Sequence, residues 1–223
     1  LKDEYGFGAE YTPTGEVRAI SPVRLVGAQF MRTATIDPNF WLSATASSAL
    51  VTQASALLSL NSGTKPTGSV YFVSNRRARY VAGAFNRFRT VIQLADAGVA
   101  SNTKKWGIAW GASMASPTDG AYFQLSGTTF SIVTLKGGSP STVNSGSFNG
   151  TLGVSYAVTT NATTYEIYWT NSKVWFVIGD EILHTVSAAT TNWADTVNHY
   201  IYLSNTNSGN TTVTEMHCRA ASI

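Results

Sequence analysis

Apolar and polar positions alternate with a period of two along much of this chain, most clearly in its last third. The runs Tyr165–Trp169 and Lys173–Ile178 are rich in aromatic and β-branched side chains, and Asn171-Ser172 between them favours a turn. Gly179-Asp180 is typical of a second hairpin turn, which leads into Ile182–Val186. The pattern predicts an antiparallel meander of three strands. Within the first run, alternation places Tyr165, Ile167 and Trp169 on one face, and Glu166 and Tyr168 on the other.

Turn-forming residues recur about every 8 to 12 residues from Asn61 onwards, a spacing typical of all-β sandwiches and barrels. The segment from Leu42 to Leu60 suits a helix by its Ala and Leu content and strands by its Ser, Thr and Val content, and we favour strands. The further predicted strands are Ser69–Ser74, Phe88–Asp96, Lys105–Trp110, Ala121–Leu125, Phe130–Leu135, Tyr200–Ser204 and Val213–Ala220.

Residues 1–36 differ from the rest of the chain, because Gly and Pro interrupt them and no long periodic element forms there. We interpret them as an extended N-terminal arm that attaches the chain to a neighbouring subunit or particle. Asp37-Pro38 then breaks the chain. Residues 37–223 are predicted to form one β-sandwich, a size that such domains reach.

Only 12% of the residues are charged, and Ser, Thr, Asn and Gly carry the polarity instead. A net charge of +3 gives a weak field, so nucleic acid is not expected as a partner. The single cysteine, Cys218, excludes an intramolecular disulfide. No apolar run approaches the roughly 20 residues needed to cross a bilayer, and no signal-peptide pattern opens the chain, so a soluble protein without a membrane partner is expected.

Four segments carry a likeness to a known family: residues 106–110, residues 119–127, Phe148-Asn149-Gly150, and the meander up to His184-Thr185. Together they resemble the concanavalin A-like jelly-roll domain of bacteriophage structural proteins, of tail-fibre, head-fibre or minor structural type. The resemblance covers about residues 40–223. It implies an antiparallel two-sheet sandwich in a virion protein, with other virion proteins as partners.

Retaining glycosidases with this architecture carry carboxylates at alternate positions of one strand, in an E-x-D-x-(x)-E arrangement that brings acid and nucleophile about 5 Å apart. No such run occurs here. Asp3-Glu4 and Asp180-Glu181 are adjacent pairs, and adjacent residues of a strand point to opposite faces. We therefore assign no catalytic residue.

The sequence gives no better support for nucleophilic catalysis or for a metal site. His184, His199 and His217 are scattered, there is no G-x-S-x-G motif, and no metal-ligand spacing occurs. No cofactor is predicted. We leave open a calcium site formed by loop carbonyls with Asp119 or Asp195, because such a site leaves little trace in a sequence.

Two kinds of side chain are candidates for binding. Most of the tryptophans have packing roles in a sandwich, but Trp110 and Trp193 lie near polar loops and are candidates for stacking on sugar rings. Five arginines interleaved with aromatic residues are candidates for a subunit interface or, less favoured, a polyanion site: Arg76, Arg77, Arg79, Arg87 and Arg89.

Three functions are compatible with these features. We favour a non-enzymatic structural protein of a phage virion, in a fibre, decoration or tail-associated position and assembled as a trimer or higher homo-oligomer. The alternative is a carbohydrate-binding module for a glycan of the host surface. A glycoside hydrolase or lyase is the third, and it lacks an assignable acid and base.

Overall fold

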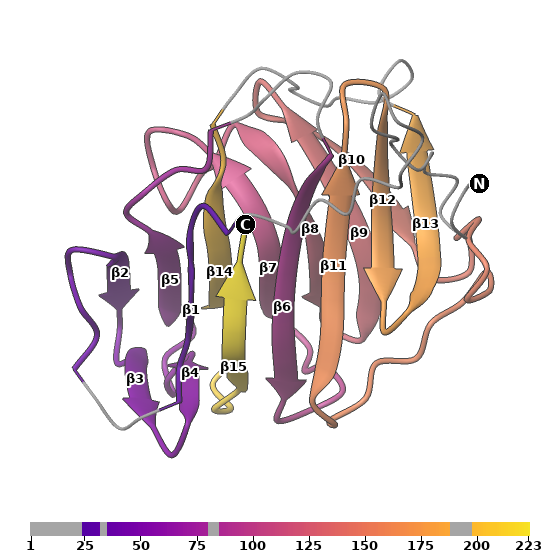
Figure 1. The fold of residues 1–223 in the computed structure, drawn as a ribbon. Helices are drawn as coiled ribbons and strands as arrows, with labels where there is room; N and C mark the ends of the chain where they lie inside the picture. Colours follow the sequence, from indigo (N-terminus) through magenta and orange to yellow (C-terminus); the bar gives the residue numbers. More distant parts are fainter. Residues whose placement is uncertain (1–23, 32–34, 80–84, 188–197) are drawn as a thin grey trace.

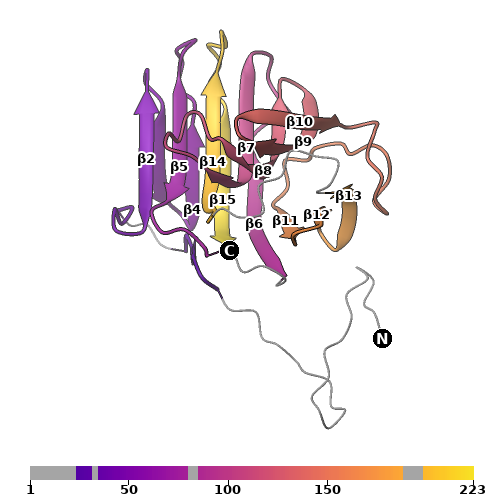
Figure 2. The same ribbon diagram turned by 90° about the horizontal axis from the view of Figure 1, so that it is seen from above.

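The computed structural model describes residues 24–31, 35–79, 85–187 and 198–223. Within these ranges every regular element is a β-strand, and no helix that could span a membrane is found among them. The strands form two antiparallel sheets stacked face to face, as Figure 2 shows from above. The prediction of an all-β, two-sheet sandwich is therefore confirmed.

The first sheet contains eight strands (Figure 1). Seven of them lie in the order β13 (Glu181–Ser187), β12 (Lys173–Ile178), β11 (Thr163–Trp169), β6 (Asn86–Leu94), β15 (Glu215–Ser222), β4 (Leu57–Asn61) and β3 (Leu50–Ala54), while β1 (Gly27–Gln29) pairs with β15.

The second sheet contains seven strands and lies behind the first in Figure 1. Its order is β10 (Ser139–Asn144), β9 (Thr129–Lys136), β8 (Asp119–Ser126), β7 (Asn102–Trp110), β14 (Tyr200–Asn207), β5 (Ser69–Ser74) and β2 (Trp41–Ala46). Strands distant in sequence are thus neighbours in both sheets, as the long connections of a jelly roll require.

Aromatic side chains from both sheets meet in the core between them. Trp106 of β7 lies edge-on to Tyr165 of β11 at 5.1 Å between ring centroids, and Phe123 of β8 lies edge-on to Phe176 of β12 at 5.2 Å. Edge-to-face packing of buried rings adds to the free energy gained by removing their apolar surface from water. The core thus takes up one face of the second sheet, and the other face of this sheet points away from it.

The predicted meander is confirmed as β11, β12 and β13. Tyr165, Ile167 and Trp169 are buried in the core, whereas Tyr168 contacts Glu166 on the opposite face, as the alternation predicts. The segment from Leu42 to Leu60 forms strands β2, β3 and β4, in agreement with the favoured interpretation. Strand β10 has no counterpart among the predictions, because its sequence is rich in Ser, Thr and Pro rather than in apolar residues.

The end of the predicted arm takes part in the sandwich. Strand β1 pairs with β15, and Phe30 is 2% exposed and packs against Trp41 and Phe72. Residues 1–23 lie outside the described ranges, so an arm that holds a neighbour stays a prediction.

Candidate functional site

The outer face of the second sheet, which points away from the core, carries a hydrophobic cluster of its own. This cluster is formed by Val73, Ala109, Tyr122, Val133, Leu135, Tyr200 and Tyr202, with Tyr71 and Met114 packed against it. Three of its four tyrosines, Tyr122, Tyr200 and Tyr202, are at most 4% exposed, and Tyr71 is partly exposed, so the face is a packed aromatic layer. We call this surface the tyrosine face.

A row of aromatic and small residues crosses the centre of the tyrosine face. Gly107 of β7 is paired with Tyr122 of β8 on one side and with Tyr202 of β14 on the other. The two tyrosine rings are 6.0 Å apart and edge-on, and both side chains are nearly fully buried. A Cβ at Gly107 would lie 2.4 Å from the carbonyl oxygen of Ala121, so only glycine fits there. This row is a packed aromatic platform.

A second row, made of polar residues, crosses the same face two residues away from the first row on each strand. The register aligns Tyr71 of β5, Ser204 of β14, Lys105 of β7, Gln124 of β8 and Ser131 of β9. Tyr71, Lys105 and Gln124 are partly exposed, whereas the two serines are buried. With strands spaced about 4.8 Å apart, the row extends about 19 Å across the sheet. We call it the polar row.

The electrostatics of the tyrosine face keep its hydroxyl groups neutral. Burial raises the pKa of Tyr122 to about 12 and also raises the pKa of Tyr71, Tyr200 and Tyr202. Burial lowers the pKa of Lys105, whose ammonium group lies 5.1 Å from the centre of the Tyr122 ring. Neutral hydroxyls and one cation can donate and accept hydrogen bonds without repelling an uncharged polar ligand.

Carboxylates are scarce on both sheets of the described residues. Among the strands of the second sheet the one acidic residue is Asp119, which accepts hydrogen bonds from the Thr118 hydroxyl at 2.8 Å and the Gly137 amide at 3.0 Å. In these ranges no strand carries two acidic residues. The structure thus shows no alternating carboxylate motif in the described strands, and Asp119 is already engaged by the protein.

Trp110, one of the two tryptophans predicted to stack on sugars, lies at the end of β7 and is partly exposed. The guanidinium of Arg77 covers its ring at 5.9 Å from the centroid. Its role in ligand binding stays a prediction. Trp193, like Asp195, lies outside the described residues.

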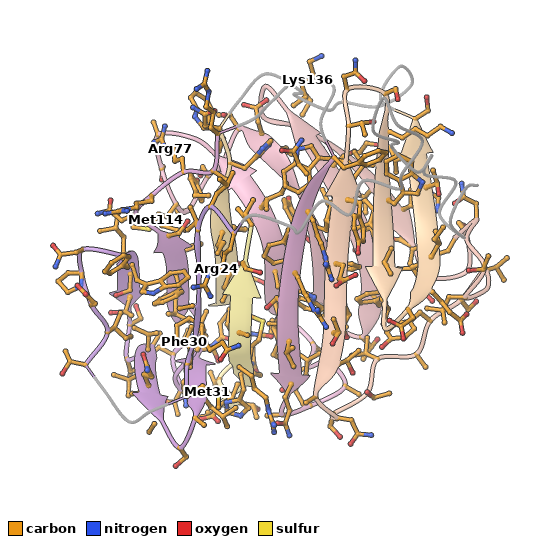
Figure 3. All side chains as sticks on the ribbon, in the orientation of Figure 1. Arg24, Phe30, Met31, Arg77, Met114 and Lys136 are labelled. Atoms are coloured by element: carbon orange, nitrogen blue, oxygen red, sulfur yellow. The ribbon has the colours of Figure 1, made fainter. Side chains whose placement is uncertain are left out.

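The five arginines predicted as one cluster do not all lie together. Arg76 covers the ring of Phe40, and Arg77 lies at the end of the tyrosine face, well apart from Arg24 in Figure 3. Arg87 and Arg89 instead bind Glu166 on the outer face of the first sheet. Arg79 follows the bridge between Ala78 and His199 and is exposed.

The histidines and the cysteine do not meet. His199 is buried against Trp169, the Nδ1 of His184 accepts the Asn149 amide at 3.2 Å, and His217 pairs with Glu215. Burial raises the pKa of Cys218 to about 12, which makes its thiol unreactive at neutral pH. No group of three potential metal ligands occurs within the part of the chain that the structure describes.

Sequence reasoning missed the tyrosine face. The alternation of Tyr200, Tyr202 and Ser204, and of Tyr122 and Gln124, is visible in the sequence. However, β7 and β14 are far apart in sequence, and only their pairing places these residues beside Lys105.

No protein-family model matches the sequence, and no curated protein matches it. Solved structures do match. A β-1,3-glucanase from Mycobacterium marinum is 12% identical with a TM-score of 0.66, covering 91% of this chain and 99% of its own. The catalytic domain of a Thermotoga petrophila laminarinase is 11% identical with a TM-score of 0.63, covering 90% and 96%. A Mycobacterium tuberculosis protein described as an immunostimulatory antigen and pseudo β-1,3-glucanase is 10% identical with a TM-score of 0.63, covering 89% and 97%.

These matches correct two predictions. The predicted function as a non-enzymatic phage structural protein is contradicted, because the similar structures named here are β-glucanases or a pseudo-glucanase, and none of them is a phage protein. The prediction that the chain is not an enzyme is contradicted too, because its fold is one that glycoside hydrolases use. The absence of a carboxylate motif did not justify that conclusion. The chain has the concanavalin A-like jelly-roll fold of the β-glucanases.

Proposed function

We propose that the tyrosine face binds a glycan, with β-linked glucans as the first class to test. The observation that carries this proposal is the polar row: Tyr71, Lys105 and Gln124 lie in one line, partly exposed, beside a packed aromatic platform. Sugars offer hydroxyl groups around apolar C–H surfaces, so they require donors, acceptors and ring faces side by side. The row supplies a phenol, an ammonium group and an amide.

The size and charge of the face support this assignment. A row about 19 Å long can contact several consecutive sugar units of an extended chain. The strands of this sheet present no carboxylate beside the row, and neutral tyrosines favour an uncharged ligand. The glucanases and the pseudo-glucanase among the similar structures indicate β-linked glucans as the class to begin with.

Replacing Gln124 by Ala is expected to weaken glycan binding about tenfold, because a hydrogen bond in a half-buried site contributes on the order of 1 to 1.5 kcal/mol. Calorimetric titration with β-1,3-glucan, mixed-linkage glucan and mannan oligosaccharides measures the change. Tyr71→Ala should weaken glycan binding by a similar factor, because Tyr71 supplies both a ring and a hydroxyl group to the row.

Gln93→Ala is the matched control, since Gln93 is a partly exposed glutamine on β6 of the first sheet. It should change the affinity less than twofold. Equal losses in Gln93→Ala and Gln124→Ala, or no binding of any oligosaccharide, would contradict the proposal. Release of reducing sugar is measured in the same samples, because the similar structures include hydrolases. If the chain cleaves an oligosaccharide and Gln124→Ala abolishes that cleavage, the reaction takes place on the tyrosine face.

A further inference from the structure

A groove on the opposite side of the sandwich brings together four arginines. Three adjoining hollows, of about 320, 180 and 390 Å³, all have Arg24 in their walls. Arg87 and Arg89 of β6 line the first hollow, Arg76 lines the second, and Arg89 also lines the third. Figure 3 shows Arg24 beside β15. We call this surface the arginine groove.

Among the described residues, none of those that line the three hollows is acidic. Among the described acidic side chains, Glu166 is nearly fully buried and binds both Arg87 and Arg89. Among the described side chains, one carboxylate faces four guanidinium groups, which gives the groove a positive potential. Charges that lie together in a groove attract an oppositely charged ligand more strongly than the same charges spread over a surface.

Two of the arginines keep donors available for a ligand. Arg89 uses its Nε towards Glu166, at 3.2 Å, and its side chain is 53% exposed. Arg24 is exposed and makes no hydrogen bond or ion pair with the described residues. The guanidinium fork matches the planar geometry of a carboxylate, which is also the group that Arg87 and Arg89 already bind in this region.

The aromatic residues beside the groove argue against single-stranded nucleic acid. Stacking of bases requires ring faces that are free. The face of Phe40 is covered by the guanidinium of Arg76 at 5.3 Å, and Phe85 packs against Trp175 at 6.2 Å. These two rings and Leu25 are each about half exposed and provide apolar surface rather than stacking platforms.

We infer that the arginine groove binds an acidic polysaccharide that carries carboxylates on successive sugars. Adjoining hollows that share Arg24 suit a chain with repeated anionic groups better than a single ion. Most of this site lies on the first sheet, and its second hollow reaches Trp41 at the edge of the second sheet. None of the residues that form the tyrosine face lines the groove, so the two proposed sites are separate. The chain would then contact two kinds of glycan, one neutral and one acidic, on opposite sides.

The test is a binding titration of the full chain with an oligogalacturonate, at low and at physiological salt. Arg24→Ala and Arg89→Ala are each expected to weaken binding about tenfold, and added salt should weaken it further. Arg89→Lys should also weaken binding several-fold, because lysine keeps the positive charge but lacks the planar, forked guanidinium group. Arg219→Ala is the matched control: Arg219 is an exposed arginine that donates to Gln93 and lines none of the three hollows. It should change the affinity less than twofold.

A panel of further probes decides the ligand class. Tighter binding of a sulfated oligosaccharide, poly-glutamate or a single-stranded oligonucleotide than of the oligogalacturonate would overturn the inference. An equal loss in Arg219→Ala would overturn it too, as would no binding at low salt. Gln124→Ala should leave oligogalacturonate binding unchanged, so a failure here is distinguishable from a failure of the neutral-glycan site.

Discussion

Lowering the pH from 7 to 4 is expected to reduce the free energy of unfolding by about 3 kcal/mol through His199 alone. His199 is 1% exposed, and its imidazole lies edge-on to Trp169 at 5.7 Å. Burial lowers its pKa to about 4, from an ordinary value of 6.5, although Asp119 acts weakly in the opposite direction. The folded state therefore binds a proton less readily than the unfolded state.

The sign of the pH dependence follows from these two values. Well above pH 6.5 the imidazole is neutral in both states, and the full stability is present. Between pH 6.5 and about 4 the unfolded chain takes up the proton while the folded chain does not, so stability is lost as the pH falls. His184, whose pKa burial also lowers, adds to the loss in the same direction.

Urea unfolding at pH 7, 6, 5 and 4 measures this dependence. His199→Gln should flatten the slope between pH 6.5 and 5, where few carboxylates titrate, whereas His184→Gln should keep most of it. An NMR titration gives the same answer without a variant, since the His199 ring signals should not shift above pH 5. A full-sized slope in His199→Gln, or an ordinary titration near pH 6.5, would show that burial does not control this group.

Replacing Asn205 by Ala is expected to destabilise the fold by about 3 to 5 kcal/mol, because it leaves several buried polar groups without partners. Asn205 lies on β14 and is 0% exposed. Its Nδ2 donates to the carbonyl oxygens of Leu60 and Thr214, both at 2.9 Å, and its Oδ1 accepts from Asn102 at 2.8 Å. This side chain thus joins the second sheet to strand β4 of the first.

A neighbouring asparagine extends the same network. Asn207 donates to the carbonyl oxygen of Lys65 at 3.0 Å and accepts from Asn102 at 2.9 Å. Asn205→Asp should be at least as damaging as Asn205→Ala, since a carboxylate cannot donate to the two carbonyl groups. The network therefore requires asparagine specifically.

Urea unfolding at pH 7 measures these changes, with Asn75→Ala as the control. Asn75 is an exposed asparagine whose amide donates to the Asn39 carbonyl at 3.3 Å, so its loss should cost less than about 0.5 kcal/mol. Losses of similar size at Asn75 and Asn205 would refute the idea that the buried network links the sheets.

The strand pattern was the most predictable part of this protein. Period-two alternation is local, and it located the meander and most strands of the core. The asparagine network was hidden because Asn207-Ser208-Gly209 has the composition of a turn, although Asn205 and Asn207 belong to β14 and are buried. Their hydrogen-bond partners include Leu60, Lys65 and Asn102. These residues are distant in sequence, so no local pattern connects them to Asn205 and Asn207.

The candidate site was less predictable for the same physical reason. Lys104 and Lys105 are adjacent and look alike in sequence, yet Lys104 is fully buried with Asp96 at 2.6 Å, while Lys105 lies on the tyrosine face. Alternation predicts that they point to opposite sides, but not which side is the core. The five predicted arginines were likewise grouped by sequence, whereas the fold places Arg76, Arg87 and Arg89 in the arginine groove with Arg24, and Arg77 against Trp110.

Glycan recognition by the tyrosine face is tested most directly by mapping backbone amide shifts in the ¹⁵N-labelled chain during titration with the tightest-binding neutral oligosaccharide. We predict that the largest shifts lie along the polar row, at Tyr71, Ser204, Lys105 and Gln124, and that the amides of Arg24 and Arg89 stay unchanged. Shifts concentrated on the first sheet, or an unchanged spectrum at saturating oligosaccharide, would contradict the account.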